Sequence, residues 1–491
     1  MNIKHMTTIL RPVSWIPAVF SVVILGGCFS VGPDYVRPEM SMSQNWHSRL
    51  TGDLVSRETD SKTLATWWTT LNDPILSGLI EQAVTGNHDL KKARARIREA
   101  RARRGIAKAD YFPTLDATGR YTRSRSSDEV GSGTTTDLYT VGFDAGWELD
   151  IFGGVRRSVE AADANLQYSQ EDWRDVLVSL LAEVALNYSE VRTYQTRLDV
   201  AESNLNTQSE TYQLTLWRYQ AGLSDELAVQ QARYNLENTR STIPTLRTGL
   251  EEAKNRIAVL LGEQPGAVHE KLDKRGPIPV ASLKIAVGVP ADILRRRPDV
   301  RKAERNLAAQ TARIGVATAD LYPKLKLTGS IGLEALSARN LFSSGSKFSS
   351  FGPSITLPIF DGGAIRQNIE VQSALQEQYL IAYEAAILSA LEEVENTLVA
   401  YAEEQNRRQS LLDATAAAKQ AADLAQKKYS TGLADFTSVL IAERSLLSLQ
   451  DELAQSEGTV TTNLIRLYKT LGGGWTLLEK NAQQQPVTGG K

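Results

Sequence analysis

The chain contains an internal sequence repeat whose two copies are offset by 210 residues. The run Arg103–Leu115 (RRGIAKADYFPTL) matches Arg313–Leu325 (RIGVATADLYPKL), and Leu261-Gly262 matches Leu471-Gly472. One constant offset over such a distance indicates a duplicated unit, and its period is too long for a solenoid array. The two halves are therefore expected to fold in the same way.

Each half contains two stretches in which apolar and polar residues alternate, at 115–122, 139–149, 325–333 and 351–359. Strands of about ten residues with one apolar and one polar face fit a transmembrane barrel. A half-buried sheet in a soluble domain would show the same alternation. Four strands cannot enclose a lumen, and open edges are not tolerated in lipid. If these strands lie in a membrane, several chains must share one barrel.

A long uninterrupted helix is predicted after each pair of strands. Val155–Arg218 contains 64 residues without proline or glycine, and Ile365–Thr431 is similarly uninterrupted. Such helices would be roughly 100 Å long. Apolar residues follow a seven-residue pattern typical of coiled coils, and these residues are Leu177, Leu181, Val184, Tyr188 and Val191, with Leu391, Val394, Leu398 and Tyr401 in the second half. Each helix should end near Gly222 or Gly432 and be followed by a shorter return helix.

The N-terminus is typical of a bacterial lipoprotein signal. Lys4 and Arg11 are cationic, the apolar stretch 15–25 is too short to span a bilayer as a helix, and Gly26-Gly27 precede the only cysteine, Cys28. We predict cleavage after residue 27 and acylation of Cys28, which would anchor the mature chain in lipid. The alternative is a buried free cysteine.

Composition and motif content point away from catalysis. Lys and Arg number 55 against 57 Asp and Glu, so the net charge of −2 creates no overall basic field for nucleic acid. The four histidines are scattered, and the sequence contains no HExxH, GxSxG, P-loop or GxGxxG motif. We predict no enzyme activity, no cofactor, no metal centre and no nucleic-acid partner.

Five further motifs are spread over nearly the whole mature chain. They are VGPDY (31–35), WELDIFGG (147–154), LRRRPDV (294–300) with Ala303-Glu304, LPIFDGG (357–363) and LGGGW (471–475). Together with the cysteine they resemble the TolC-like outer membrane factor family. The resemblance is to its lipoprotein (NodT-like) branch, which serves resistance-nodulation-division efflux pumps.

The resemblance implies an α+β membrane protein that forms a homotrimer. Three chains with four strands each would make a twelve-stranded barrel in outer membrane lipid, continued by a long α-helical barrel in the periplasm. The implied domains are a signal peptide (1–27), an N-terminal linker and equatorial segment (28–70), the first repeat (71–262), an equatorial linker (263–290), the second repeat (291–472) and a C-terminal equatorial tail (473–491).

The resemblance also implies a passive exit duct for small molecules such as drugs or toxic organics. An inner-membrane pump and a periplasmic adaptor would deliver them. A duct for type I protein secretion and heavy-metal efflux remain alternatives, although methionine occurs only at 1, 6, 40 and 42 and so offers the channel no thioether for soft metals. A soluble coiled-coil scaffold or a periplasmic adaptor is a further alternative, but an adaptor would not need four membrane-length strands. The sequence does not identify the substrate, the pump or the adaptor.

In the family, the turns after the long helices form periplasmic tips where the tunnel closes and the adaptor docks. The corresponding residues here are Tyr219, Gly222, Leu223, Asp225, Glu226, Tyr429, Gly432, Leu433 and Asp435. Positions that are acidic in some members are Ala228, Ser438 and Ile441 in this chain. We therefore expect Asp435 to supply the charge, and Tyr429 to latch a neighbouring Asp225 or Glu226. The glycines' alternative role is only to end helices.

Three other features favour structural roles. The basic run 91–104 carries charge around most of its helix, which favours a solvated or inter-protomer face over nucleic acid or lipid headgroups. Arg295–Arg297 precede an expected helix start at Pro298. Trp67-Trp68 is expected to pack near the tunnel wall, and a cofactor-binding pair is the alternative.

Overall fold

The computed structural model describes residues 30–39, 45–48, 54–56, 61–280 and 285–475. The predicted signal peptide and Cys28 lie outside these residues. The chain divides into two compact units. The first contains 100–166 and 305–380 with the segment up to Arg37, and it carries the long-stranded sheet. The second contains 38–99, 167–304 and the part from Ile381, and it carries the main apolar core.

The two halves of the chain form the same series of elements. The first half contains α4 (His88–Ala109), β2 (Thr114–Arg125), β3 (Thr135–Leu149), α5 (Gly154–Gln220) and α6 (Glu226–Leu261). The second contains α9 (Pro298–Ala319), β5 (Lys324–Ala335), β6 (Lys347–Thr356), α10 (Ala364–Ser430) and α11 (Phe436–Thr470). The pairs α4/α9, β2/β5, α5/α10 and α6/α11 each begin 210 residues apart, which is the offset of the sequence repeat.

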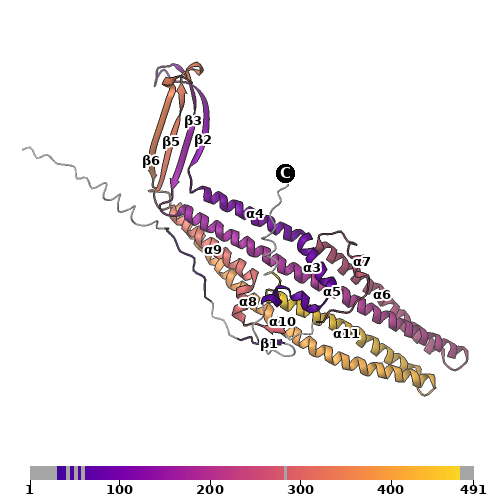
Figure 1. The fold of residues 1–491 in the computed structure, drawn as a ribbon. Helices are drawn as coiled ribbons and strands as arrows, with labels where there is room; N and C mark the ends of the chain where they lie inside the picture. The colour runs from indigo at the N-terminus through magenta and orange to yellow at the C-terminus, as the bar shows by residue number, and fades with distance from the viewer. Residues whose placement is uncertain (1–29, 40–44, 49–53, 57–60, 281–284, 476–491) are drawn as a thin grey trace, which may run out of the picture. The chain divides into compact units, whose positions relative to one another are not determined.

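The four long strands form one antiparallel sheet in the order β2-β3-β5-β6 (Figure 1). In its register Phe143 of β3 lies opposite Ala117 of β2 and Ile331 of β5, and Leu325 of β5 lies opposite Ile355 of β6. Directly opposed residues share a face of the sheet. The register therefore aligns the apolar positions of all four strands on one face, as their alternation predicts. Strands β2 and β6 are the two edges.

The fourth strand differs from its predicted limits of 351 and 359. It begins earlier, at Lys347, and ends earlier, at Thr356. Pro358 has no backbone N–H to donate to a sheet, and it follows the last strand residue by two positions. Pro353 is accommodated inside β6 because β6 is an edge strand.

The long helices α5 and α10 contain 67 residues each, so each is about 100 Å long. All five residues of the predicted coiled-coil pattern in α5 are fully buried in the core of the second unit. In α10, Val394, Leu398 and Tyr401 are buried in the same core, whereas Leu391 is half-buried. Helices α6 and α11, which we call the return helices, contribute the facing side chains.

Smaller elements surround this core. They are α2 (Ser61–Ala65), η1 (Trp67–Leu71), α3 (Pro74–Gly86), α7 (His269–Leu272), α8 (Pro290–Arg296) and a parallel pair of short strands, β1 (Leu54–Ser56) and β4 (Ile285–Val287). Trp67 is buried and stacks on Tyr468, with 5.5 Å between ring centroids. The 3-10 turns η2 (Ala338–Asn340) and η3 (Ser344–Ser346) connect β5 to β6.

None of the described helices has the combination of length and apolar character needed to cross a membrane.

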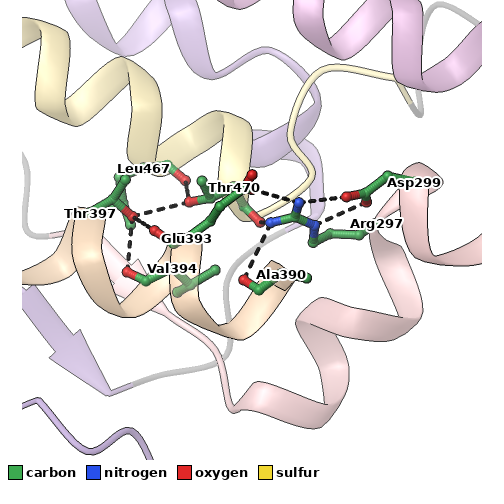
Figure 2. Close-up of polar contacts among 8 residues, drawn as sticks. All are labelled: Arg297, Asp299, Ala390, Glu393, Val394, Thr397, Leu467 and Thr470. Carbon is green, nitrogen blue, oxygen red and sulfur yellow. Dashed lines mark hydrogen bonds and ion pairs between the residues drawn. The ribbon is translucent and has the colours of Figure 1, made fainter. Parts of the chain in front are cut away.

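Arg297 joins three helices of the second unit (Figure 2). It lies between α8 and α9 and donates two hydrogen bonds to Asp299, of 3.0 and 2.6 Å, and one of 2.7 Å to Glu393 on α10. Its Nη1 also donates to the carbonyl oxygens of Ala390 and Thr470, at 3.4 and 3.3 Å. Burial alone would lower the pKa of Arg297, but the hydrogen bonds to the carboxylates outweigh it and raise that pKa. The guanidinium thus stays charged immediately before α9, which begins at Pro298 as the sequence predicts.

Candidate functional site

The sheet has one polar face on which side chains pair across strands. Asp144 of β3 accepts hydrogen bonds from Thr118 of β2 (2.8 Å) and from Ser330 of β5 (2.7 Å). Lys326 of β5 forms an ion pair of 3.3 Å with Glu148 of β3. These contacts join three strands through polar groups alone, which is the pattern of a surface in contact with water.

The opposite face of the sheet is apolar and exposed. Phe143 is 53% exposed, Ile331 63% and Phe351 78%, although each is large and apolar. The three side chains lie on neighbouring strands and on one face. A contiguous exposed apolar face marks contact with lipid or with another protein.

The two tips have the same backbone design. Gly222 and Gly432 have φ of +73° and +76°, which lies in the left-handed region that glycine adopts without strain. The next residues, Leu223 and Leu433, donate backbone hydrogen bonds back to the preceding helix, to Arg218 O and Lys428 O. Glycine therefore ends each long helix, in the manner of a Schellman turn.

An aspartate begins each return helix. The Asp225 carboxylate accepts a hydrogen bond of 2.9 Å from the Ala228 N–H, and the Asp435 carboxylate accepts one of 3.0 Å from the Ser438 N–H. The Ser438 hydroxyl also donates to Asp435, at 2.8 Å. The hydrogen bond from the Ser438 N–H and then that from its hydroxyl lower the pKa of Asp435. Both acids are therefore N-caps, and Asp435 carries its charge to lower pH than an ordinary aspartate.

Tyr429 packs at the centre of the tips. Its ring contacts Phe436 with 5.4 Å between centroids, and the Arg218 guanidinium lies 4.5 Å above it. Arg218 Nη1 also donates to Tyr429 O at 2.9 Å. The Tyr429 hydroxyl is buried and has no hydrogen-bond partner in the described part of the chain, so it reaches neither Asp225 nor Glu226 here. Leu223 and Leu433 are 69% and 79% exposed at the ends of the tips.

A polar ladder joins α5 to the hairpin of the second repeat. Its rungs leave α5 at every seventh residue, from Arg197, Asn204, Thr211 and Arg218. Their acceptors are Asp451 (2.7 Å), the Gln450 side chain (2.7 Å), Glu443 (2.8 Å) and Tyr429 O (2.9 Å), respectively. Because α5 and α11 are long, these four contacts align the two tips with each other.

Glu443 is a buried carboxylate within this ladder. Thr211 donates to its Oε1, but its Oε2 is buried without a hydrogen-bond partner among the described residues. Burial raises the pKa of Glu443, and the Thr211 hydrogen bond opposes only part of that effect. Sequence reasoning did not single out Glu443 or Arg218. The signal that could have found them is spacing: Arg218 lies seven residues after Thr211, and Glu443 lies seven residues before Gln450.

Arg157 holds the segment that follows the predicted lipidation site. It donates to Val31 O (3.1 Å), Gly32 O (3.2 Å) and the Asp34 carboxylate (2.7 Å). Gly32 has a φ of +86°, and a Cβ there would lie 2.5 Å from the Gly315 Cα on α9. The VGPDY motif thus forms a turn whose backbone carbonyl oxygens and Asp34 carboxylate accept hydrogen bonds from one buried arginine.

No three His, Cys, Asp or Glu side chains in the described ranges are grouped so that they could hold a metal ion.

Comparison with known proteins identifies the family. The model of the family described as "Outer membrane efflux protein" matches residues 79–263 and 289–473. The chain belongs to the outer membrane efflux protein family. Its function is that of an outer membrane efflux channel, and members of this family are not enzymes. The two matched ranges correspond to the two repeats that the sequence shows.

Three curated relatives cover nearly the whole of this efflux protein. Nodulation protein T of Rhizobium leguminosarum bv. trifolii is 33% identical over 89% of this chain and 92% of its own. The toluene efflux pump outer membrane protein TtgI of Pseudomonas putida is 32% identical, over 94% and 98%. The probable outer membrane lipoprotein SilC of Salmonella typhimurium is 31% identical, over 93% and 98%.

Among solved structures, the outer-membrane channel OprN superposes with a TM-score of 0.86 at 37% identity, covering 91% of this chain and 99% of OprN. The predicted resemblance to TolC-like channels, the α+β class and the outer membrane location are thereby confirmed. Family members are the outer membrane components of tripartite efflux systems, which work with an adaptor and an inner-membrane pump.

Proposed function

We propose that this efflux protein acts as a homotrimer whose three sheets close into one twelve-stranded barrel. The observation that carries the proposal is the single four-stranded sheet with an exposed apolar face, a polar face and two edges, β2 and β6. An unpaired edge in lipid costs several kcal/mol for each unsatisfied backbone group. Pairing β6 of one copy with β2 of the next removes every edge and encloses the polar face.

The tips are proposed to close the periplasmic end of the duct and to receive the adaptor. The exposed Leu223 and Leu433 supply apolar contacts for an adaptor, and both follow the glycine of their tip. Asp435 would appear three times around the axis, so it is proposed to favour cations at the closed end. A resistance-nodulation-division pump is the proposed energy source.

The proposed cargo is small organic molecules. The family's duct is passive, so the pump makes most of the selection, and the name of one relative refers to toluene. The test is a deletion strain complemented with this gene and profiled against solvents, dyes and antibiotics, with pump and adaptor identified by copurification. Restored resistance to organic compounds supports the proposal. Restored secretion of a protein without any change in susceptibility would overturn it.

Cys28 is proposed to carry the lipid anchor. In the sequence it lies three positions before Val31, the first residue whose backbone Arg157 binds. SilC, named a probable outer membrane lipoprotein, supports the assignment. Metabolic palmitate labelling should mark the wild-type protein and not Cys28→Ser. Equal labelling of both proteins would contradict the proposal.

A further inference from the structure

The two ends of the long-stranded sheet are joined to different parts of the chain. α4 runs into β2, and β3 runs into α5, so one end of the sheet is joined to helices. At the opposite end, which we call the loop end, the connections 126–134 and 336–346 join β2 to β3 and β5 to β6. In the proposed duct the helices extend into the periplasm. The loop end then lies at the outer surface of the membrane.

The apolar face of the sheet carries charge at its loop end alone. Directly opposed residues share a face, and every second residue of a strand returns to it. From Phe143 and Ile331 this rule leads to Leu149 and Leu325 near the helices, without meeting a charged residue. The charged residues on this face of the four strands are Arg123, Arg125, Asp137 and Lys347. All four lie toward the loop end, and three of them are basic.

Two tyrosines mark where the apolar band ends. Tyr121 and Tyr139 lie opposite each other on this face, with 4.8 Å between ring centroids. The ten residues from Tyr139 to Leu149 span roughly 33 Å of strand, or about 25 Å of height at a tilt of about 40°, which is the height of the apolar band of an outer membrane barrel. Aromatic residues line both borders of such a band. Arg123 and Arg125 follow Tyr121 on the same face, so they lie at the depth of the outer headgroups.

The two arginines are exposed and only loosely paired with acids. Their side chains are 65% and 69% exposed. Arg123 Nε lies 3.7 Å from Asp137 Oδ1, and Arg125 Nη2 lies 4.0 Å from Asp128 Oδ2, and both distances are longer than a hydrogen bond. Asp137 instead accepts a hydrogen bond of 2.9 Å from the Tyr121 hydroxyl. A guanidinium has N–H donors on each of its nitrogens, so both arginines can bind a further acceptor.

The spacing of the arginines suits a phosphorylated headgroup. Side chains two residues apart on one strand are separated by roughly 7 Å, so two guanidinium groups can grip one phosphate from both sides. Arginine matches phosphate oxygens in geometry and in charge. The outer leaflet of a bacterial outer membrane consists of glycolipids built on a phosphorylated disaccharide, lipid A. The connection 126–134 also carries Asp128 and Glu129, so it is the strand face, rather than the net charge of the loop end, that is complementary to phosphate.

We propose that Arg123 and Arg125 bind the phosphate groups of an outer-leaflet glycolipid of the lipid A class, with the Tyr121 ring packed at the border between its headgroup and its acyl chains. Lys347 begins the other edge strand and attracts the same headgroups there. Basic residues near an anionic membrane surface are drawn to it. This site rests on the proposed barrel, because only a lipid-facing apolar face brings the arginines to the headgroups.

The experiment uses the full-length protein in mild detergent, titrated with lipids and observed by native mass spectrometry. The lipids are phosphorylated lipid A, the same lipid after phosphatase treatment, and phosphatidylglycerol. Wild-type protein should bind phosphorylated lipid A about tenfold or more tightly than either other lipid, because only this lipid offers phosphates on a disaccharide. Arg123→Gln/Arg125→Gln should lower that affinity about tenfold or more and abolish the preference. Added salt should weaken wild-type binding, because salt screens exposed charges.

A matched control removes two positive charges from the other face of the same sheet. Arg120 lies opposite Thr140 on the polar face, and Lys326 lies opposite Glu148 on that face. Arg120→Gln/Lys326→Gln should therefore bind phosphorylated lipid A as wild type does. Arg123→Lys/Arg125→Lys keeps the charges and should keep part of the preference, which provides a second reading if the glutamine variant folds poorly.

Three results would overturn the lipid site while leaving the proposed duct intact. They are equal wild-type binding of phosphorylated and dephosphorylated lipid A, equal binding of phosphatidylglycerol, and a control variant that loses as much affinity as Arg123→Gln/Arg125→Gln. The same spectra report the oligomeric state separately. A wild-type protein that forms no trimers would contradict the proposed function, whereas the lipid preference of whichever species is present decides the lipid site.

Discussion

Asn87 and Arg297 lie at equivalent positions of the two repeats, and each donates a hydrogen bond to the equivalent backbone carbonyl oxygen of its own repeat. Asn87 Nδ2 donates to Leu260 O at 2.9 Å, and Arg297 Nη1 donates to Thr470 O at 3.3 Å. Both acceptors belong to the last turn of a return helix, where carbonyl oxygens lack helical partners. The first repeat uses a neutral amide for this contact, and the second uses a guanidinium that also binds two carboxylates.

This difference predicts unequal effects of mutation. Arg297→Asn should lower the free energy of unfolding by about 2–3 kcal/mol, because Asp299 and Glu393 lose charged hydrogen bonds. Asn87→Ala removes this neutral contact together with the cap that Asn87 Oδ1 gives the Leu90 N–H, and it should cost only about 1 kcal/mol. Thermal unfolding in detergent, followed by circular dichroism, measures both. Equal losses would show that the carboxylates add nothing to the second contact.

Glu443 should make stability depend on pH. Its pKa is raised in the folded state, so its contribution is most favourable below the ordinary value of 4.5 and is lost as the pH rises through the folded pKa. Glu443→Gln keeps the acceptor for Thr211 and removes the buried charge. Relative to wild type, it should stabilise the fold by about 1–3 kcal/mol at pH 7.5 and leave it unchanged at pH 4. The exposed Glu210→Gln is the control, and a benefit that is the same at both pH values would contradict the assignment.

The two faces of the sheet should respond oppositely to arginine. Phe143→Arg places a cation on the exposed apolar face and should cost about 2–4 kcal/mol if that face meets lipid near the midplane. Thr140→Arg, on the polar face, should be tolerated. Heat-resistant trimers in outer membrane extracts provide the measurement. Greater damage from Thr140→Arg would mean that the apolar face is not the lipid face.

Asp435 combines a structural and an electrostatic role that one substitution separates. Asparagine also caps helices well, so Asp435→Asn should preserve stability while it reduces cation selectivity in single-channel recordings. Asp435→Ala should lose selectivity and about 1 kcal/mol of stability as well. Because the pKa of Asp435 is lowered, wild-type selectivity should be lost only at a lower pH than an ordinary aspartate would give. Unchanged selectivity in Asp435→Asn would remove this residue from the gate.

The ring of Tyr429, rather than its hydroxyl, should keep the tips together. Tyr429→Phe retains the contacts with Arg218 and Phe436 and loses only a hydroxyl that has no partner in the described chain. It should therefore leave uptake of large antibiotics unchanged. Tyr429→Ala should increase uptake, because it removes the ring from the small apolar cluster at the tips. Increased uptake in Tyr429→Phe would favour a latch made by the hydroxyl.

Most of the fold could be predicted because its signals are local and long. Alternation over about ten residues defines the strands, and the register then places Phe143 and Ile331 on one face. The long stretches without proline or glycine predicted the ends of α5 and α10 to within one or two residues. The pairing of β1 with β4 was not predicted, because three residues are too few to show a period.

The candidate site was predicted less completely. The positions of Gly222, Gly432, Asp225 and Asp435 follow from local turn and cap chemistry, and all four lie where the helices end or begin. The contact of Arg218 with Tyr429 joins residues 211 positions apart, and no local pattern reports such a partner. Buried Glu443 was missed because its burial depends on α5, a distant segment.

The polar ladder between α5 and the second hairpin has a consequence for alignment. Apolar residues that repeat every seventh position would still meet if the helices slipped by seven residues. The rungs differ in chemistry, so after such a slip Arg197 would face the amide of Gln450 instead of the carboxylate of Asp451. Asn204 would in turn replace the hydroxyl of Thr211 as the partner of Glu443. The slip would take the arginine away from the Asp451 carboxylate, a loss of about 1–3 kcal/mol, and this favours the native alignment.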